Sequence, residues 1–141
     1  LLLALMDSNL DKDAWKQTSD ILESYLLRRA VCGLDTKNYN RIFLSLTRTL
    51  RREGFSADGL KSVLLGQTGE SGIWPDDATF REAWLQKPLY GPLNSPKLVH
   101  LYSRLNQTFM SSKSEALAFS QSPTVEHVMP RDWITNWPLP D

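Results

Sequence analysis

The chain has little cysteine and no net charge, and each of these two features excludes a class of protein. Cys32 is the single cysteine among 141 residues, so no disulfide can form within the chain and no zinc site can be built on cysteine pairs. Its 16 basic and 16 acidic residues cancel, which excludes a polybasic chain held on nucleic acid or an anionic membrane by total charge alone. A lone cysteine suits a reducing compartment, so we expect a cytoplasmic protein.

Long hydrophobic runs are also missing. The apolar stretch Leu1–Met6 is far shorter than the roughly 20 residues that span a bilayer, and it lacks the basic flank of a secretory signal. The glycine-rich run 66–72 lacks the Lys-Ser or Lys-Thr pair of a phosphate-binding loop. We therefore expect no membrane partner and no nucleotide hydrolysis. Because the sequence opens inside an apolar stripe and without Met, we expect it to be a segment of a longer protein.

What the sequence does contain is helical periodicity, which extends over most of residues 1–110. Each apolar stripe is preceded by a residue type that caps helix N-termini. The predicted caps are Asp20, Thr36, Ser56, Asp76 and Ser95. Gly33 and Gly54 follow two of the stripes and predict where those helices end. The sequence therefore predicts a mainly α protein, an irregular bundle of five to six helices.

The character of the sequence changes after these helices. Residues 111–122 are polar and rich in Ser, which predicts a connector. The run 124–130 is β-type and ends in proline, which predicts a short extended segment near the C-terminus. We therefore divide the chain into a helical domain (1–110), a connector (111–122) and the start of a further domain (123–141).

The C-terminal run contains the sequence Glu126-His127-Val-Met-Pro130. One-metal nucleases of the His-Me finger type place a histidine beside a carboxylate at a strand end, because a neutral, rigidly aimed imidazole takes the proton from the water that attacks phosphorus. A divalent cation beside it stabilises charge on the scissile phosphate. Taken alone, the His-x-x-Pro spacing also fits a packed or surface histidine, so both interpretations stay open.

Five motifs in order resemble the helical middle of GmrSD-type proteins and the start of their C-terminal nuclease domain. They are Glu23–Gly33, Thr36–Phe43, Trp74–Phe80, Leu89-Tyr90, and Val125–Pro130 with Trp137. In that family a ParB-like nucleotide-hydrolysing domain is joined through helices to an HNH-like His-Me finger endonuclease. Its members act as modification-dependent type IV restriction enzymes or related anti-phage defence proteins.

The resemblance implies roles for three residues. His127 matches the family's catalytic histidine, Pro130 completes its His-x-x-Pro motif, and Glu126 lies where several HNH relatives place a metal-binding carboxylate, although a carboxylate there can equally point away. It also implies DNA as the substrate of the intact protein and Mg²⁺ or another divalent cation as its cofactor. The ParB-like domain and the Asn-rich strand and helix that complete the nuclease are not in this chain, since 14 residues follow His127. We therefore expect the fragment to be inactive by itself and to hold no cofactor.

Arg28 and Arg29 extend the apolar stripes of the helix predicted over 20–32, so at least one guanidinium should lie at the core boundary. A partly buried arginine needs a carboxylate or carbonyl partner. A structural clamp and a phosphate contact are the two interpretations. Cys32, on the same stripe, is expected to be a small buried hydrophobe.

A basic stripe follows the next predicted helix. Arg41, Arg48 and Arg52 recur at i, i+7 and i+11, opposite the apolar stripe. Such a stripe can lie along a DNA backbone, where each neutralised phosphate releases counterions. A solvated helix face has the same pattern, so both interpretations stay open. The alternative to a nuclease fragment is therefore a non-catalytic helical module that contacts the DNA backbone or a partner protein.

Overall fold

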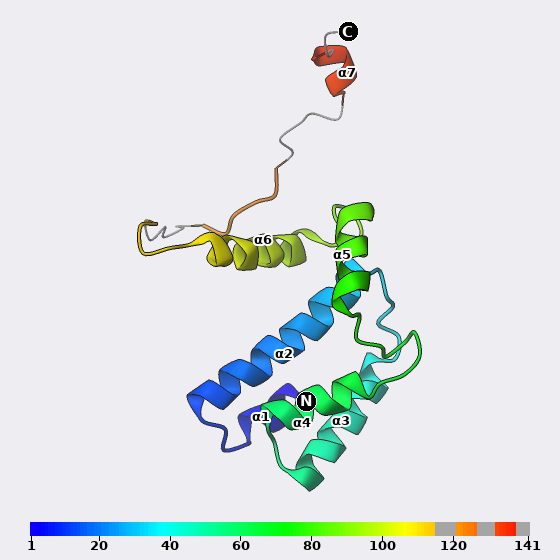
Figure 1. The fold of residues 1–141 in the computed structure, drawn as a ribbon, viewed down its shortest axis with the longest axis vertical. Coiled ribbons are helices and arrows are strands. Elements are labelled where there is room, and N and C mark those ends of the chain that lie inside the picture. Colours follow the sequence, from blue (N-terminus) through cyan, green and yellow to red (C-terminus); the bar gives the residue numbers. More distant parts are fainter. Residues whose placement is uncertain (115–120, 127–131, 138–141) are drawn as a thin grey trace. The chain divides into compact units, whose positions relative to one another are not determined.

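A computed structural model describes residues 1–114, 121–126 and 132–137. Within these ranges it contains seven helices and no strand (Figure 1), which confirms the predicted mainly α fold. The helices are α1 (Leu2–Met6), α2 (Lys12–Val31), α3 (Tyr39–Glu53), α4 (Ala57–Leu65), α5 (Asp77–Gln86), α6 (Ser95–Phe109) and α7 (Trp133–Asn136). The chain divides into two compact units, Leu1–Pro92 and Leu93–Asp141.

The helix α2 begins well before its predicted start. Its N-cap is Asp11, whose carboxylate accepts the N–H of Ala14 at 2.8 Å. The predicted cap Asp20 was therefore wrong, because it lies in the helix interior and pairs with Lys16 one turn earlier at 2.6 Å. Spacing alone cannot separate a capping pair such as Asp20 and Glu23 from two acidic residues on one face of a longer helix.

The connection between α2 and α3 is partly as predicted. Gly33 ends α2 with a φ of 71°, and the N–H groups of Gly33 and Leu34 donate back to carbonyls of the last turn, the pattern of a Schellman motif. The next helix begins at Tyr39 with Asn38 in the N-cap position, so the predicted cap Thr36 was wrong. The carbonyl of Thr36 instead accepts the N–H of Tyr39 in a turn.

Two of the remaining caps are confirmed and one is shifted. Ser56 and Asp76 each accept the backbone N–H of the third residue after them, at 3.1 and 2.8 Å. The helix α6 is capped by Asn94 instead of Ser95, because the amide oxygen of Asn94 supplies the same acceptor one residue earlier. Pro96 then occupies the first turn, where its missing N–H breaks no helical hydrogen bond.

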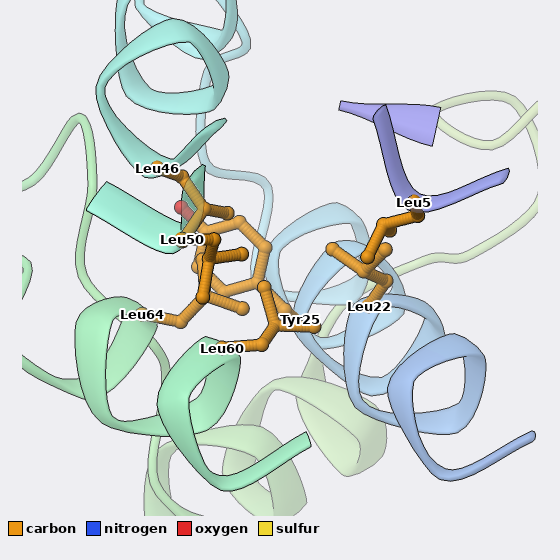
Figure 2. Close-up of a cluster of buried hydrophobic side chains, with 7 residues drawn as sticks. All are labelled: Leu5, Leu22, Tyr25, Leu46, Leu50, Leu60 and Leu64. Atoms are coloured by element: carbon orange, nitrogen blue, oxygen red, sulfur yellow. The ribbon is translucent and has the colours of Figure 1, made fainter. Parts of the chain in front are cut away.

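The core of the first unit forms where α1, α2, α3 and α4 meet, with α4 packed against both α2 and α3. Figure 2 shows four of its buried leucines gathered around the ring of Tyr25 and two more next to one another at one side. The buried side chains of this core are Leu5, Leu22, Tyr25, Leu46, Leu50, Leu60 and Leu64. Tyr25 has no exposed surface, and its hydroxyl donates to the carbonyl of Gly72 at 3.0 Å. Thr18 of α2 differs from these side chains, because its hydroxyl is buried and has no hydrogen-bond partner among the residues that the structure describes.

The second unit contains α6 and α7. Leu98 and Leu101 of α6 are buried, whereas Tyr102 is half exposed. Residues 121–126 form neither helix nor strand, and the rest of the predicted extended segment, 127–130, lies outside the described residues. No helix in the described ranges has both the length and the apolar character needed to cross a membrane.

Candidate functional site

Arg29 lies inside the first unit and has no exposed surface. Its guanidinium reaches from α2 into the connection before α3 and the loop before α5. It donates to four backbone carbonyls and to the hydroxyl of Tyr39, the last at 3.3 Å from Nε. The carbonyls belong to Asp35, Glu70, Ser71 and Ile73, at 2.8, 3.3, 3.0 and 2.8 Å. Arg29 therefore joins α2 to the connection that follows it and to a loop about forty residues further along the chain.

Aromatic rings complete the surroundings of this cation. The guanidinium carbon lies 5.6 Å from the ring centre of Tyr25 and 5.4 Å from that of Tyr39. Both distances suit a cation–π interaction, which gains strength away from water. Burial raises the pKa of Tyr25 above 10.0, and the nearby Arg29 opposes part of that rise. The phenol therefore stays neutral and can donate its hydrogen bond to the loop at neutral pH.

Arg28 makes a second clamp at the edge of the same loop. It donates to the carbonyl of Pro75 at 3.1 Å, pairs with Asp77 in the first turn of α5, and lies 5.1 Å from the ring centre of Phe80. Both arginines are thus engaged by the fold. Of the two interpretations of this pair, the structural clamp is the one that the geometry supports.

Cys32, at the end of α2, is buried as predicted. Burial raises the pKa of its thiol, and the opposing effects of Lys87 and Arg28 are smaller. The ammonium of Lys87 donates instead to the backbone carbonyl of Cys32. A thiol whose pKa is raised is poorly nucleophilic, so this residue fills space and has no activated sulfur.

The predicted basic stripe lies on the exposed face of α3. Arg52 pairs with Glu53 at 2.8 Å, and both side chains remain largely exposed. Arg41 and Arg48 form no ion pair or hydrogen bond with any residue that the structure describes. The three arginines do share one face, and two of them have charges that no contact in the described part of the chain balances.

The predicted nuclease residues cannot be placed as a group. His127 and Pro130 lie outside the described residues. Glu126 is exposed, and its carboxylate accepts the hydroxyl of Thr124 at 3.2 Å. No cluster of three His, Cys, Asp or Glu side chains suited to a metal occurs in residues 1–114, 121–126 and 132–137. The roles of His127 and Glu126 remain predictions.

An apolar groove between α1, α2 and α3 was missed by the sequence analysis. Its volume is about 840 Å³, and most of its lining is aliphatic or aromatic. Residues from all three helices contribute, among them Leu2, Leu26, Phe43 and Leu44, with Arg51 at one side. The available signal was Leu44, an apolar residue of α3 that lies off the helix face of Ile42, Leu46 and Leu50.

Comparison of the chain with protein-family models, curated proteins and solved structures found no match. The assignment of a function therefore depends on the geometry and on the motifs quoted above.

Proposed function

We propose that this chain is the helical support of a GmrSD-like, modification-dependent DNA endonuclease, joined to the first segment of its nuclease centre. One observation carries the proposal: three of the five motifs meet at one packed cluster. Glu23–Gly33 contributes Tyr25 and Arg29, Thr36–Phe43 contributes Tyr39, whose hydroxyl accepts from Arg29, and Trp74–Phe80 contributes Trp74, whose ring centre lies 5.7 Å from that of Tyr25. The packing therefore brings these three motifs together, and the role that they support is mechanical.

The chemistry in this proposal is assigned to the C-terminal segment. His127 accepts the proton of the attacking water, and Glu126 is the candidate carboxylate for a divalent cation that stabilises charge on the phosphate. Glu126 is exposed and its known partner is a neutral hydroxyl, so its carboxylate is accessible to a cation. One carboxylate does not make a metal site, since Mg²⁺ is bound by one or two carboxylates together with water and substrate phosphates. We therefore propose that the fragment alone does not cut DNA.

The test is cleavage by a longer protein that contains this chain and continues past Asp141. With Mg²⁺ and modified duplex DNA, we expect cutting by the parent protein and by the control His100→Ala, which changes the exposed histidine of α6. We expect His127→Ala to abolish cutting. Full activity of His127→Ala would remove the role assigned to this residue.

A cytoplasmic location belongs to the same proposal, because the substrate is DNA and Cys32 is a thiol.

A second candidate function is a non-catalytic interaction module, and a different observation favours it. Arg41 and Arg48 are exposed and have no ionic partner in the described ranges, whereas Arg28 and Arg29 are engaged by the fold. If α3 contacts the DNA backbone, affinity for duplex DNA should fall steeply with salt. Neutralising Arg41, Arg48 and Arg52 should then lower both the affinity and its salt dependence. No binding of duplex DNA at low salt would leave the support role alone.

A further inference from the structure

The outer side of α3 carries two adjacent stripes of different character. Asn40, Leu44, Thr47 and Arg51 recur at i, i+4, i+7 and i+11 and line the apolar groove. One residue further along, the stripe of Arg41, Arg48 and Arg52 follows the same spacing. Each set lies on one face of the helix, so the basic stripe lies on the neighbouring face of α3, about 100° further round the helix axis, and forms a rim outside the residues that line the groove.

The apolar surface of the groove is open to solvent. Leu2, Leu3 and Leu44 line it and are 63%, 77% and 53% exposed, and Leu26 adds a smaller exposed area. Contiguous apolar surface of this kind on a soluble protein marks an interaction site. A concave apolar site between helices is the form that binds the apolar face of an amphipathic helix.

Charge restricts the kind of helix that fits. None of the lining residues, all within the described part of the chain, is acidic, and the one charged residue among them is Arg51. The adjacent rim contributes Arg41 and Arg48, which have no ionic partner in that same part. Acidic side chains at the edge of an incoming apolar face would meet these charges, and complementary charges across an interface set its specificity and orientation.

We propose that this groove binds an amphipathic helix of a partner protein that carries acidic residues along the edge of its apolar face. The inference goes beyond the nuclease proposal and does not depend on His127. It assigns Arg41, Arg48 and Arg51 to the recognition of acidic side chains, and Leu44 to the apolar contact.

Three other occupants fit the face less well. A DNA backbone would pair with the arginines but leave the apolar lining exposed to water, so the lining would contribute nothing to the free energy of binding. A two-fold dimer through this face would bring the same basic stripe of both copies to one interface, since such contacts are isologous. A membrane surface does not follow a concave groove, whereas a helix does.

The test uses two labelled peptides about three heptads long, with the same apolar face and with either Glu or Lys along its edge. Fluorescence anisotropy should show that this chain binds the Glu peptide at least ~10-fold more tightly than the Lys peptide. We expect Leu44→Ser to weaken binding of the Glu peptide about 10-fold. The control Leu85→Ser, at an exposed leucine of α5 outside the groove, should leave the affinity unchanged.

Charge reversal provides a readout that a merely structural role would not give. Arg48→Glu should lower the affinity for the Glu peptide and raise the affinity for the Lys peptide. Arg81→Glu, at an exposed position of α5, should change neither affinity. Binding of neither peptide, or equal binding of both, overturns the proposal. So does peptide binding that is unchanged in Leu44→Ser.

The competing occupants are separate outcomes that also overturn it. Without peptide binding, duplex DNA affinity that is lost in Arg48→Glu and kept in Leu44→Ser assigns the face to nucleic acid. Sedimentation of a dimer that Leu44→Ser dissociates assigns it to a second copy. Binding to vesicles of anionic lipid that depends on Leu44, with no preference between the peptides, assigns it to a membrane. DNA cleavage by the longer protein is measured separately, so failure here leaves the nuclease proposal unaffected.

Discussion

The arginines of α2 and the arginines of α3 both lie on helices of the first unit, but their environments are opposite. Arg29 on α2 is fully buried, and its donors meet carbonyls and a phenol. Arg41 and Arg48 on α3 are exposed, with no ionic partner in the described residues. The difference arises from the loop at residues 66–76, which folds back over α2 and supplies carbonyls to Arg29. A cation that is satisfied in this way stabilises the fold, whereas an unbalanced one is available to a partner.

The largest expected effect comes from removing the satisfied cation. Arg29→Ala should lower the free energy of unfolding by about 4 kcal/mol, because four backbone carbonyls lose their donor and the fully buried side chain leaves a cavity beside two aromatic rings. Urea unfolding followed by far-ultraviolet circular dichroism measures the change.

The matched variant Arg29→Lys keeps the positive charge and loses the planar guanidinium, whose N–H donors point in several directions. It should recover less than half of the stability, because one ammonium cannot reach carbonyls in several directions at once. A loss below about 1 kcal/mol in Arg29→Ala would mean that the loop does not depend on Arg29, and the comparison with Arg48 would fail.

A smaller effect is expected for the neighbouring phenol. Tyr25→Phe should lower the free energy of unfolding by about 1 to 2 kcal/mol, because the buried carbonyl of Gly72 loses its donor. Since burial raises the pKa of Tyr25, the folded state holds this proton more tightly than the unfolded state does. The resulting stability is fully present below pH 10.0 and is lost as pH rises through the higher folded pKa.

This dependence can be measured by urea unfolding about one pH unit below and one unit above the ordinary value of 10.0. The parent chain should lose more stability between the two conditions than Tyr25→Phe does. Equal losses in both would show that the phenol titrates in the folded state as it does in the unfolded chain, contrary to its buried position.

Thr18 provides the opposite test, since it is a buried polar group with no hydrogen-bond partner in the described part of the chain. Thr18→Val keeps the shape and removes the hydroxyl, so it should raise the free energy of unfolding by about 1 kcal/mol. Thr18→Ser, which keeps the hydroxyl and removes the methyl group, should lower it. A loss of stability in Thr18→Val would mean that the hydroxyl is satisfied after all.

Much of the fold could be predicted from the sequence, because it depends on local patterns. The apolar periodicity of α3, the caps Ser56 and Asp76, and the end of α2 at Gly33 are each determined within one or two turns of the chain. The start of α2 could not be found in this way. Asp11 and Asp20 both precede apolar residues, and the structure decides between them through the N–H of Ala14.

The sites were harder to predict because they depend on contacts between distant segments. The sequence analysis expected a partner for Arg28 or Arg29, but it could not identify the carbonyls of a loop about forty residues away, at Glu70, Ser71 and Ile73. A burial pattern shows which residues lie inside, and it does not show which backbone atoms will reach them. The groove was missed for the same reason, since α1 and α3 are separated in sequence and each contributes only part of its lining.

The smallest expected effect on stability comes from removing the unbalanced cations. Arg41→Ala together with Arg48→Ala should change the free energy of unfolding by no more than about 0.5 kcal/mol, because neither side chain has a partner to lose within the described ranges. Four basic residues follow this side of α3, so at low salt the double variant should be slightly the more stable protein. Added salt should remove that gain by screening the repulsion. A loss above about 1 kcal/mol at both salt concentrations would mean that these arginines stabilise the fold as Arg29 does, and the surface would no longer be available to a partner.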